Sequence, residues 1–480
     1  MTRSGSRCAG WGVVLGTLLA VLGGCPPSDP EPNAPPPAPD PNAPPPAPEP
    51  NLPAAGGSLV EVPAPLSGDN PVYPLMAAAP PAAGETVNDP RLGTAQTRVV
   101  DTVGLRHEYA RHDPFNADGT LVLLLYLPAG EWRVYRTASV PYDQDANLVR
   151  TVSLEEPRWD PANPALLWGF REFRVVTVDT VSGAETIVKD FAADAALAPL
   201  VSANPDLYRV TTRDEGEPSG DFRYWALLVQ GAAEDYRARY LFTWDRQQDR
   251  VLGVRALPAD EARIDWAGMS PRGTWVLVGG DWDNGAPLAG LTLANRELTD
   301  FHRLDYGIAH SDVGLDSDGR EVIVMQNTQT DYIDLIPLDP STQPIPDSGG
   351  SYANTGRVPL IRLFYDSASA LGLNSSVHIS CNLPGYCVVS TFTEPNRPAQ
   401  NWLDRTITLV RLNPRAPRVF RLAQVYGTAG AYWEETQASI TRDGSRIVWA
   451  TNWGQDVGRE RVWLMQLALP PGWRDALAAP

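Results

Sequence analysis

The sequence predicts an all-β fold, a seven-bladed β-propeller that occupies residues 57–480. Three observations support this fold class: a recurring pattern of a tight turn followed by an apolar strand, its near-regular spacing, and a second hairpin in several repeats. The turns fall at Gly119, Pro164, Gly220, Gly273, Gly319, Gly385 and Gly444. Successive turns are 45 to 66 residues apart. Spacing of this size, with a hairpin in each copy, is typical of propeller blades.

The strand after each turn is apolar on both faces, as in the run 322–325, Val-Ile-Val-Met. A sheet with two apolar faces has to be covered on both sides, so the repeats are expected to stack around a ring. The Asp-Gly turns before several of these strands supply the positive φ that a tight hairpin needs. Second hairpins are predicted at 239–257 and 406–422, as the outer two strands of four-stranded blades.

The last repeat is short of strands, because only 461–469 follows its apolar strand at 446–451. A strand from the N-terminal side is expected to complete this blade and to remove an exposed sheet edge. Two segments, 58–62 and 97–103, have the composition of a strand, and the sequence does not choose between them.

The N-terminus resembles a bacterial lipoprotein signal peptide, predicted over residues 1–24. Arg3 and Arg7 precede a short apolar stretch that ends in Leu-Gly-Gly-Cys at 22–25. A basic start, a short apolar core and small residues before a cleavage point are typical of secretory signals. The resemblance to a lipobox implies that Cys25 is lipidated and anchors the protein to a membrane. Pro26 follows this cysteine, which favours the outer membrane over retention in the inner membrane; an unlipidated secretory signal is the alternative.

Residues 25–56 are predicted to form a proline-rich tether after the lipidated cysteine. The nine-residue unit Asn-Ala-Pro-Pro-Pro-Ala-Pro-Asp-Pro begins at Asn33, and a copy with one Asp-to-Glu change begins at Asn42. Proline at this density prevents sheet pairing and favours extended polyproline II. The segment is interpreted as a spacer, because nothing in it indicates a binding role.

The composition fits an acidic, exported protein. The formal net charge is −18 and the sequence pI is near 4.7. This charge argues against nucleic acid as a partner.

Two cysteines remain after the signal peptide and Cys25 are set aside. Cys381 and Cys387 bracket the turn of the sixth repeat, where residues on the two strands lie opposite each other. A disulfide between them fits this geometry and an oxidising compartment.

Candidate site residues come from the position seven residues before each turn, near the start of the innermost strand. Reading this position in chain order gives His112, Pro157, Arg213, Trp266, Asp312, His378 and Gln437, and His310 lies two residues further upstream in the fifth repeat. If these side chains point to the ring axis, they form a polar channel. Such a ring can bind an anionic or hydroxyl-rich ligand, or it can hold a divalent metal. A water-filled channel lined by polar side chains fits the same pattern.

The repeats, above all 440–454 and 315–327, resemble those of TolB-type β-propellers over most of residues 100–470. Some relatives with such repeats are oligogalacturonate lyases, which use a histidine-and-glutamine metal site in the channel. This distant likeness implies His310, His378 and Gln437 as candidate ligands of a divalent metal, manganese or calcium. It also implies His112 or Arg213 as the proton acceptor of a β-elimination. Ala438 and Ser439 depart from the lyase pattern, which has further histidines beside its glutamine.

The function expected from the sequence is therefore an envelope-anchored lipoprotein whose propeller binds or scaffolds a protein or glycan partner. Its predicted ligand-binding channel comprises His112, Arg213, Trp266, Asp312, His378 and Gln437. The alternative is a metal-dependent polysaccharide lyase with its site in the same channel.

Overall fold

The computed structural model describes residues 59–478, except 63, 65, 67–69, 72, 74, 233–235, 262, 282–285, 328, 346–350, 365–376, 393–400 and 455–460. The predicted signal peptide, Cys25 and the tether lie outside the described residues. Within the described part, none of the helices has both the length and the apolar character needed to cross a membrane.

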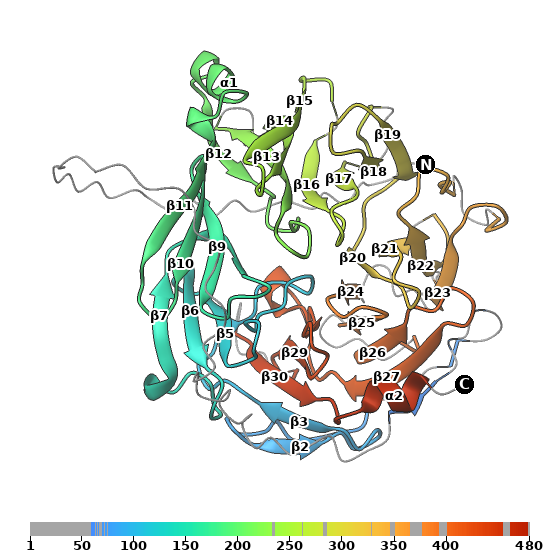
Figure 1. The fold of residues 1–480 in the computed structure, drawn as a ribbon. Coiled ribbons are helices and arrows are strands. Elements are labelled where there is room, and N and C mark those ends of the chain that lie inside the picture. The colour runs from blue at the N-terminus through green and yellow to red at the C-terminus, as the bar shows by residue number, and fades with distance from the viewer. Residues whose placement is uncertain are drawn as a thin grey trace. The chain divides into compact units, whose positions relative to one another are not determined.

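Seven antiparallel sheets stand around a central axis, which confirms the seven-bladed β-propeller (Figure 1). Blade 1 comprises β4 (Leu105–Arg106), β5 (Leu121–Tyr126), β6 (Glu131–Arg136) and β7 (Leu148–Val152). Blade 2 comprises β8 (Glu155–Trp159), β9 (Leu166–Arg171), β10 (Arg174–Asp179) and β11 (Glu185–Asp190). Blade 3 comprises β12 (Leu207–Thr211), β13 (Tyr224–Gly231), β14 (Ala238–Asp245) and β15 (Arg250–Ala256). Blade 4 comprises β16 (Ile264–Met269), β17 (Val276–Gly280), β18 (Leu291–Ala294) and β19 (Phe301–Asp305).

Blade 5 comprises β20 (Ser311–Leu315), β21 (Glu321–Asn327), β22 (Tyr332–Pro337) and β23 (Val358–Arg362). Blade 6 comprises β24 (Val377–Ser380), β25 (Tyr386–Thr391), β26 (Thr406–Arg411) and β27 (Arg418–Gln424), with β1 (Val60–Glu61) added at its edge. Blade 7 comprises β28 (Ser439–Ile440), β29 (Arg446–Thr451), β30 (Trp463–Ala468), β3 (Ala95–Arg98) and β2 (Thr86–Asn88). The helical elements are short: α1 (Ala198–Ala203), α2 (Trp473–Ala478), and the 3₁₀ turns η1 (Asp145–Asn147), η2 (Phe191–Ala193) and η3 (Tyr432–Glu434).

Both candidate N-terminal segments pair with the C-terminal part of the chain. Strand β3 closes blade 7 by pairing with β30, with Gln96 opposite Leu467 and Arg98 opposite Met465. Strand β1 pairs with β27 of blade 6 instead, with Glu61 opposite Phe420. The ring is therefore closed by β3, which begins two residues before the predicted segment 97–103, while the segment at 58–62 protects the edge of the neighbouring blade.

The core lies between neighbouring blades, as the two-faced apolar strands predict. One apolar cluster joins Val134 of blade 1 to Val176 of blade 2, and another joins Val324 of blade 5 to Val389 of blade 6. Each Å² of apolar surface that the packing of neighbouring sheets removes from water stabilises the fold by about 25 cal/mol.

Five of the seven predicted turn positions have the expected left-handed backbone. Gly119, Gly273, Gly319, Gly385 and Gly444 have φ between 70° and 84°. Gly220 does not need this conformation, because in its turn Phe222 takes the positive φ, at 55°.

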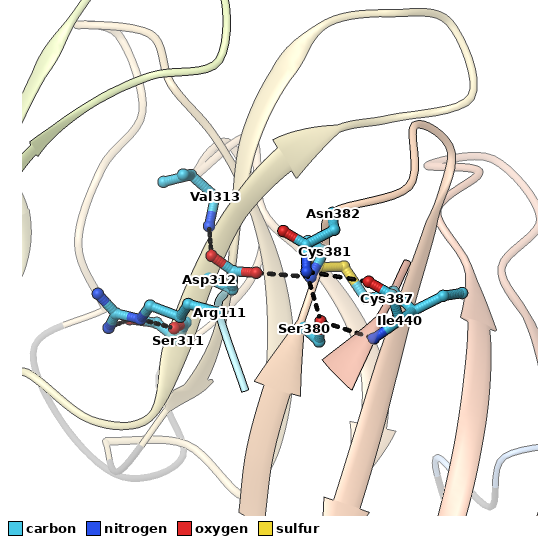
Figure 2. Close-up of a disulfide and its surroundings, with 9 residues drawn as sticks. All are labelled: Arg111, Ser311, Asp312, Val313, Ser380, Cys381, Asn382, Cys387 and Ile440. Atoms are coloured by element: carbon cyan, nitrogen blue, oxygen red, sulfur yellow. Dashed lines mark hydrogen bonds between the residues drawn. A yellow bond between two sulfur atoms is a disulfide. The ribbon is translucent and has the colours of Figure 1, made fainter. Parts of the chain in front are cut away.

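The predicted disulfide between Cys381 and Cys387 is present, with a Cα–Cα distance of 4.2 Å. The disulfide lies directly beyond the last paired residues of β24 and β25, at a place where three inner strands meet (Figure 2). The backbone N–H of Cys381 donates to Asp312 Oδ2 of blade 5 at 2.6 Å. Ser380 Oγ accepts from the N–H of Ile440 in blade 7 at 3.1 Å. The sixth hairpin is therefore joined to both of its neighbours at the centre of the ring.

Candidate functional site

The inner strand of blade 1 is interrupted. Arg106 pairs with Leu125 of β5, and the next bridge joins Phe115 to Val122. These two bridges are nine residues apart on the inner strand and only three apart on β5. The extra residues leave the ladder, as in a very large β-bulge. We call residues 107–113 the axial loop.

The axial loop of blade 1 contacts all six of the other blades. Arg111 shows this most clearly: its Nε donates to Ser311 O of blade 5 at 2.6 Å, and its Nη1 donates to Glu215 O, just after β12 of blade 3, at 2.9 Å. Its guanidinium also lies 4.4 Å over the ring of Trp266 in blade 4. The axial-loop side chains and backbone contact Arg158, Glu215, Trp266, Ser311, His378 and Ser439, which represent blades 2 to 7. The loop therefore fills the centre of the ring.

The side chain of Tyr109 in the axial loop meets three side chains from outside the loop. Tyr109 Oη lies 3.3 Å from His310 Nδ1, and the rings of His310 and His378 are 4.4 Å apart between centroids. His378 Nε2 lies 2.6 Å from Glu435 Oε2. We call Tyr109, His310, His378 and Glu435 the axial cluster. His310 and Glu435 are half-buried, so the cluster is partly open to solvent.

Burial sets the protonation of the axial cluster. It lowers the pKa of His310 to about 3, and together with the positive charge of Arg106 it lowers the pKa of His378 to about 3. It raises the pKa of Glu435 to about 7, against the opposing charge of Arg106. Both imidazoles are therefore neutral at neutral pH, where Glu435 changes its charge.

Tyr432 of η3 stands next to the axial cluster. It is 47% exposed and its ring contacts that of Trp433, with centroids 5.0 Å apart. Partial burial raises its pKa, and the charges of Glu215 and Glu435 raise it further. An exposed aromatic ring thus lies among carboxylates and neutral imidazoles.

The structure brings most of the predicted channel residues to the axial loop or the axial cluster. His378 is part of the cluster, and Trp266 and Asp312 line a cavity of about 10 Å³ beside Arg111, with room for about one water molecule. His112 is buried, with Nδ1 3.0 Å from Glu217 Oε1 and Nε2 2.7 Å from Arg158 Nη2. Its ring is thus already bonded on both sides.

Arg213 is placed differently from the other predicted channel residues. It follows β12 with a φ of 61°, and its Nη1 donates to Tyr236 O at 3.4 Å. Of the two residues predicted as proton acceptors, His112 therefore lies in the axial loop and Arg213 lies apart from the cluster.

The predicted metal ligands converge only in part. His310 and His378 are in contact, but Gln437 Oε1 accepts a hydrogen bond from Arg106 Nη2 at 2.7 Å. A guanidinium on the ligand oxygen opposes the binding of a cation at that oxygen. Among the residues that the structure describes, no three His, Cys, Asp or Glu side chains are grouped as a metal site. As arranged here, the trio with Gln437 does not fit a divalent metal.

Sequence reasoning did not select Tyr109, Arg111, Tyr432 or Glu435. One signal was present for the first two: the stretch 106–113, Arg-His-Glu-Tyr-Ala-Arg-His-Asp, is dense in polar and titratable residues where other repeats place an inner strand.

The burial of Asp312 can be tested through the pH dependence of the free energy of unfolding. Burial raises its pKa to about 8, against the charge of Arg111. The unfolded state loses this proton near pH 3.9, so the folded state holds an extra proton up to about pH 8. The free energy of unfolding should therefore fall as pH rises through this window, by about 1.4 kcal/mol per pH unit from this residue.

Asp312→Asn should reduce this slope between about pH 6.5 and 8, where the titration of the histidines is common to variant and wild type and cancels in the comparison. Urea unfolding at a series of pH values measures it. Asp318→Asn, in the turn between β20 and β21 of the same blade, should keep the wild-type slope. An unchanged slope in Asp312→Asn would show that this carboxyl is ionised in the folded protein at neutral pH.

No family model matches the chain, and no curated protein matches its sequence. Solved structures do match its fold. An oligogalacturonate lyase in complex with manganese is similar, with a TM-score of 0.51 and 12% identity, over 85% of this chain and all of that one. The oligogalacturonate lyase from Vibrio parahaemolyticus is similar as well, with a TM-score of 0.51 and 9% identity, over the same shares of the two chains. The chain shares their fold. The predicted likeness to these propellers is confirmed at that level, and the TolB-type assignment stays a prediction.

Proposed function

We propose that this protein is an exported, lipid-anchored binding protein whose propeller binds a glycan at the axial cluster. The observation that carries the proposal is the grouping of Tyr432, His310 and Glu435, all at least partly open to solvent, next to a channel centre that the axial loop fills. Sugars present hydroxyl groups and apolar C–H faces. A site with an aromatic face and a few convergent polar groups suits such a ligand.

The hydrogen-bonding inventory also favours hydroxyl groups as the ligand's polar atoms. A neutral imidazole offers one donor and one acceptor, a carboxylate offers acceptors only, and the tyrosine hydroxyl offers both. A hydroxyl group can donate to Glu435 and accept from an imidazole at the same time. The arginines nearest the cluster, Arg106 and Arg111, are already bonded to backbone carbonyls and side chains, so neither is free to hold the carboxylates of an acidic glycan.

Binding of oligosaccharides to the purified protein tests the proposal, first on an array of neutral and acidic glycans and then by calorimetry. Tyr432→Ala and Glu435→Gln should each weaken binding at least about tenfold. Tyr236→Ala is a matched control, because Tyr236 is equally exposed, at 49%, and lies in blade 3 away from the cluster. Binding that survives both Tyr432→Ala and Glu435→Gln would place the glycan elsewhere.

The membrane attachment belongs to the same proposal. The lipobox-like residues 22–25 support lipidation of Cys25, which then anchors the propeller to the outer membrane through the proline-rich tether. Cys25→Ala should move the protein from the membrane fraction to the soluble fraction. Continued membrane association of this variant would contradict the anchor.

A metal-dependent polysaccharide lyase is the second candidate function. The contact between the neutral rings of His310 and His378 favours it, as does the fold shared with oligogalacturonate lyases. The hydrogen bond from Arg106 to Gln437 weighs against it. Near-stoichiometric manganese or calcium in the purified protein, lost in His310→Ala or His378→Ala and accompanied by cleavage of uronate oligomers, would favour the lyase over the binding protein.

A further inference from the structure

Arg213 lies in a strained turn that the axial cluster does not use. It is two residues beyond the end of β12 and has a left-handed backbone, with a φ of 61°. The next residue, Asp214, is left-handed as well, with a φ of 67°. Few residues other than glycine adopt this conformation, and two in succession persist only where the surroundings hold them. Backbone strain of this kind is concentrated at ligand-binding and active sites.

A buried carboxylate of blade 2 holds this turn. Glu156 is 5% exposed, and its carboxylate accepts hydrogen bonds from the hydroxyl of Thr211, from the N–H of Thr212 at 2.9 Å and from Thr212 Oγ1 at 2.5 Å. Thr211 Oγ1 in turn accepts from the N–H of Arg213 at 2.7 Å. These bonds fix the backbone from which the Arg213 side chain extends.

The guanidinium of Arg213 has unused donors. It is half-buried, and its one hydrogen bond within the described ranges joins Nη1 to Tyr236 O at 3.4 Å, which is long for such a bond. Four of the five N–H donors of a guanidinium are therefore left for solvent or a ligand. Arg209, four residues earlier, differs in this respect, because its Nη1 lies 2.6 Å from Glu155 Oε2 in an ion pair.

Charges of the same sign lie near Arg213. Burial lowers the pKa of Arg213, and the charges of Arg263 and Arg209 lower it further. The carboxylates of Asp265 and Asp214 oppose this effect, but neither of them forms an ion pair with the Arg213 guanidinium. Neighbouring guanidinium groups repel one another, and an anion bound beside them would relieve this repulsion.

The surroundings of these arginines are held in place by a buried amide. Gln230 is 3% exposed, and its Oε1 accepts from Arg209 Nε at 2.6 Å and from Tyr208 Oη at 2.9 Å. The Arg209 guanidinium lies 5.4 Å from the centre of the Tyr208 ring, which meets the Tyr236 ring edge to face at 5.9 Å. The groups around Arg213 are thus ordered before any ligand binds, which lowers the cost of binding.

We propose that Arg213 anchors a second binding site, at the end of β12, for a tetrahedral oxyanion such as a phosphate or sulfate group. Its unused donors form the planar fork that binds two oxygen atoms of such a group. The charges of Arg209 and Arg263 favour an ion with more than one negative charge over a single carboxylate. The site lies apart from the axial cluster and does not depend on the proposed glycan binding.

Isothermal titration calorimetry of the full-length purified protein tests this site, with inorganic phosphate, inorganic sulfate and acetate titrated separately. The wild type should bind phosphate or sulfate at one site per chain and more tightly than acetate. Arg213→Gln should weaken this binding at least about tenfold, because it removes charge-assisted hydrogen bonds. This variant is expected to fold, since the side chain is half-buried and its hydrogen bond is long.

Two further variants complete the experiment. Asp265→Asn removes an exposed carboxylate that repels an anion, so it should strengthen binding about two- to fivefold. Arg150→Gln is the matched control: Arg150 is also half-buried and donates to backbone carbonyls, Thr180 O at 3.1 Å and Val181 O at 3.3 Å, between blades 1 and 2. It should leave the affinity unchanged.

Saturable binding of phosphate or sulfate that is lost in Arg213→Gln and kept in Arg150→Gln supports the proposal, and the tighter of the two ions identifies the group. The proposal is overturned if neither ion binds the wild type, if acetate binds as tightly, or if both arginine variants weaken binding equally. Should Arg213→Gln fail to fold, an unchanged affinity in Asp265→Asn overturns it.

Discussion

Replacing Arg357 by methionine should lower the free energy of unfolding by about 3–5 kcal/mol, the range measured when one partner of a buried ion pair is removed. Arg357 Nη1 lies 2.7 Å from Asp305 Oδ2 and 3.6 Å from Asp334 Oδ2, and the three side chains are at most 1% exposed. The guanidinium also donates to Leu304 O and Gln343 O. Without it, two carboxyl groups stay buried near each other between blades 4 and 5.

Protonation of the buried carboxyl groups can relieve part of this loss in the free energy of unfolding. Burial already raises the pKa of Asp334 to about 6, and the nearby Asp305 adds to this rise. Urea unfolding at about pH 7.5 therefore measures most of the loss, and the loss should be smaller at about pH 5. Arg320→Met is the control, because Arg320 is 71% exposed and 3.9 Å from Asp318. A surface pair of this kind is worth about 0–1 kcal/mol. If the free energy of unfolding fell no more in Arg357→Met than in this control, the buried ion pairs of Arg357 would contribute nothing to the stability of the contact between blades 4 and 5.

The sequence was sufficient to predict the blades, because each blade depends on local patterns. A turn such as 441–445, with Gly444 at positive φ, fixes a hairpin, and the apolar strand after it requires neighbours on both faces. The disulfide followed for the same reason: Cys381 and Cys387 bracket one turn, and the hairpin register places them opposite each other.

The site could be predicted only where the inner strands keep the same spacing from the turn. His378 and Asp312 lie in unbroken strands, and both are at the centre of the ring. In blade 1 the turn–strand pattern begins at Phe115, after the axial loop, so among the residues that leave the ladder its spacing selects only His112. Glu435 was missed because it lies before β28, in an irregular segment whose carbonyl at Glu435 accepts a hydrogen bond from Arg106, more than 300 residues away. Contacts of this kind arise from ring closure and have no local pattern.

The axial loop gives the second prediction with a large effect. Arg111→Met should lower the free energy of unfolding by about 2–4 kcal/mol, because it leaves two carbonyls, Ser311 O and Glu215 O, without their donor and removes the partner of the Glu215 carboxylate. The Arg111–Glu215 distance is 3.0 Å, and the Glu215 side chain is 30% exposed, which places the expected loss below that of a fully buried pair. Arg171→Met is the control, since Arg171 is paired with Glu185 at 2.7 Å on the surface and should lose at most about 1 kcal/mol.

The pH dependence of this loss distinguishes a charge effect from a packing effect. Burial raises the pKa of Glu215, and the charge of Arg111 opposes that rise. In Arg111→Met the pKa should rise further, so that folded Glu215 holds a proton that the unfolded chain has already released. A group whose folded pKa is raised favours the folded state less as pH increases. The destabilisation measured by urea unfolding should therefore be larger at about pH 8 than at about pH 5. An equal loss at both pH values would show that Arg111 holds the axial loop through packing against Trp266 and its carbonyl hydrogen bonds, with no contribution from its charge.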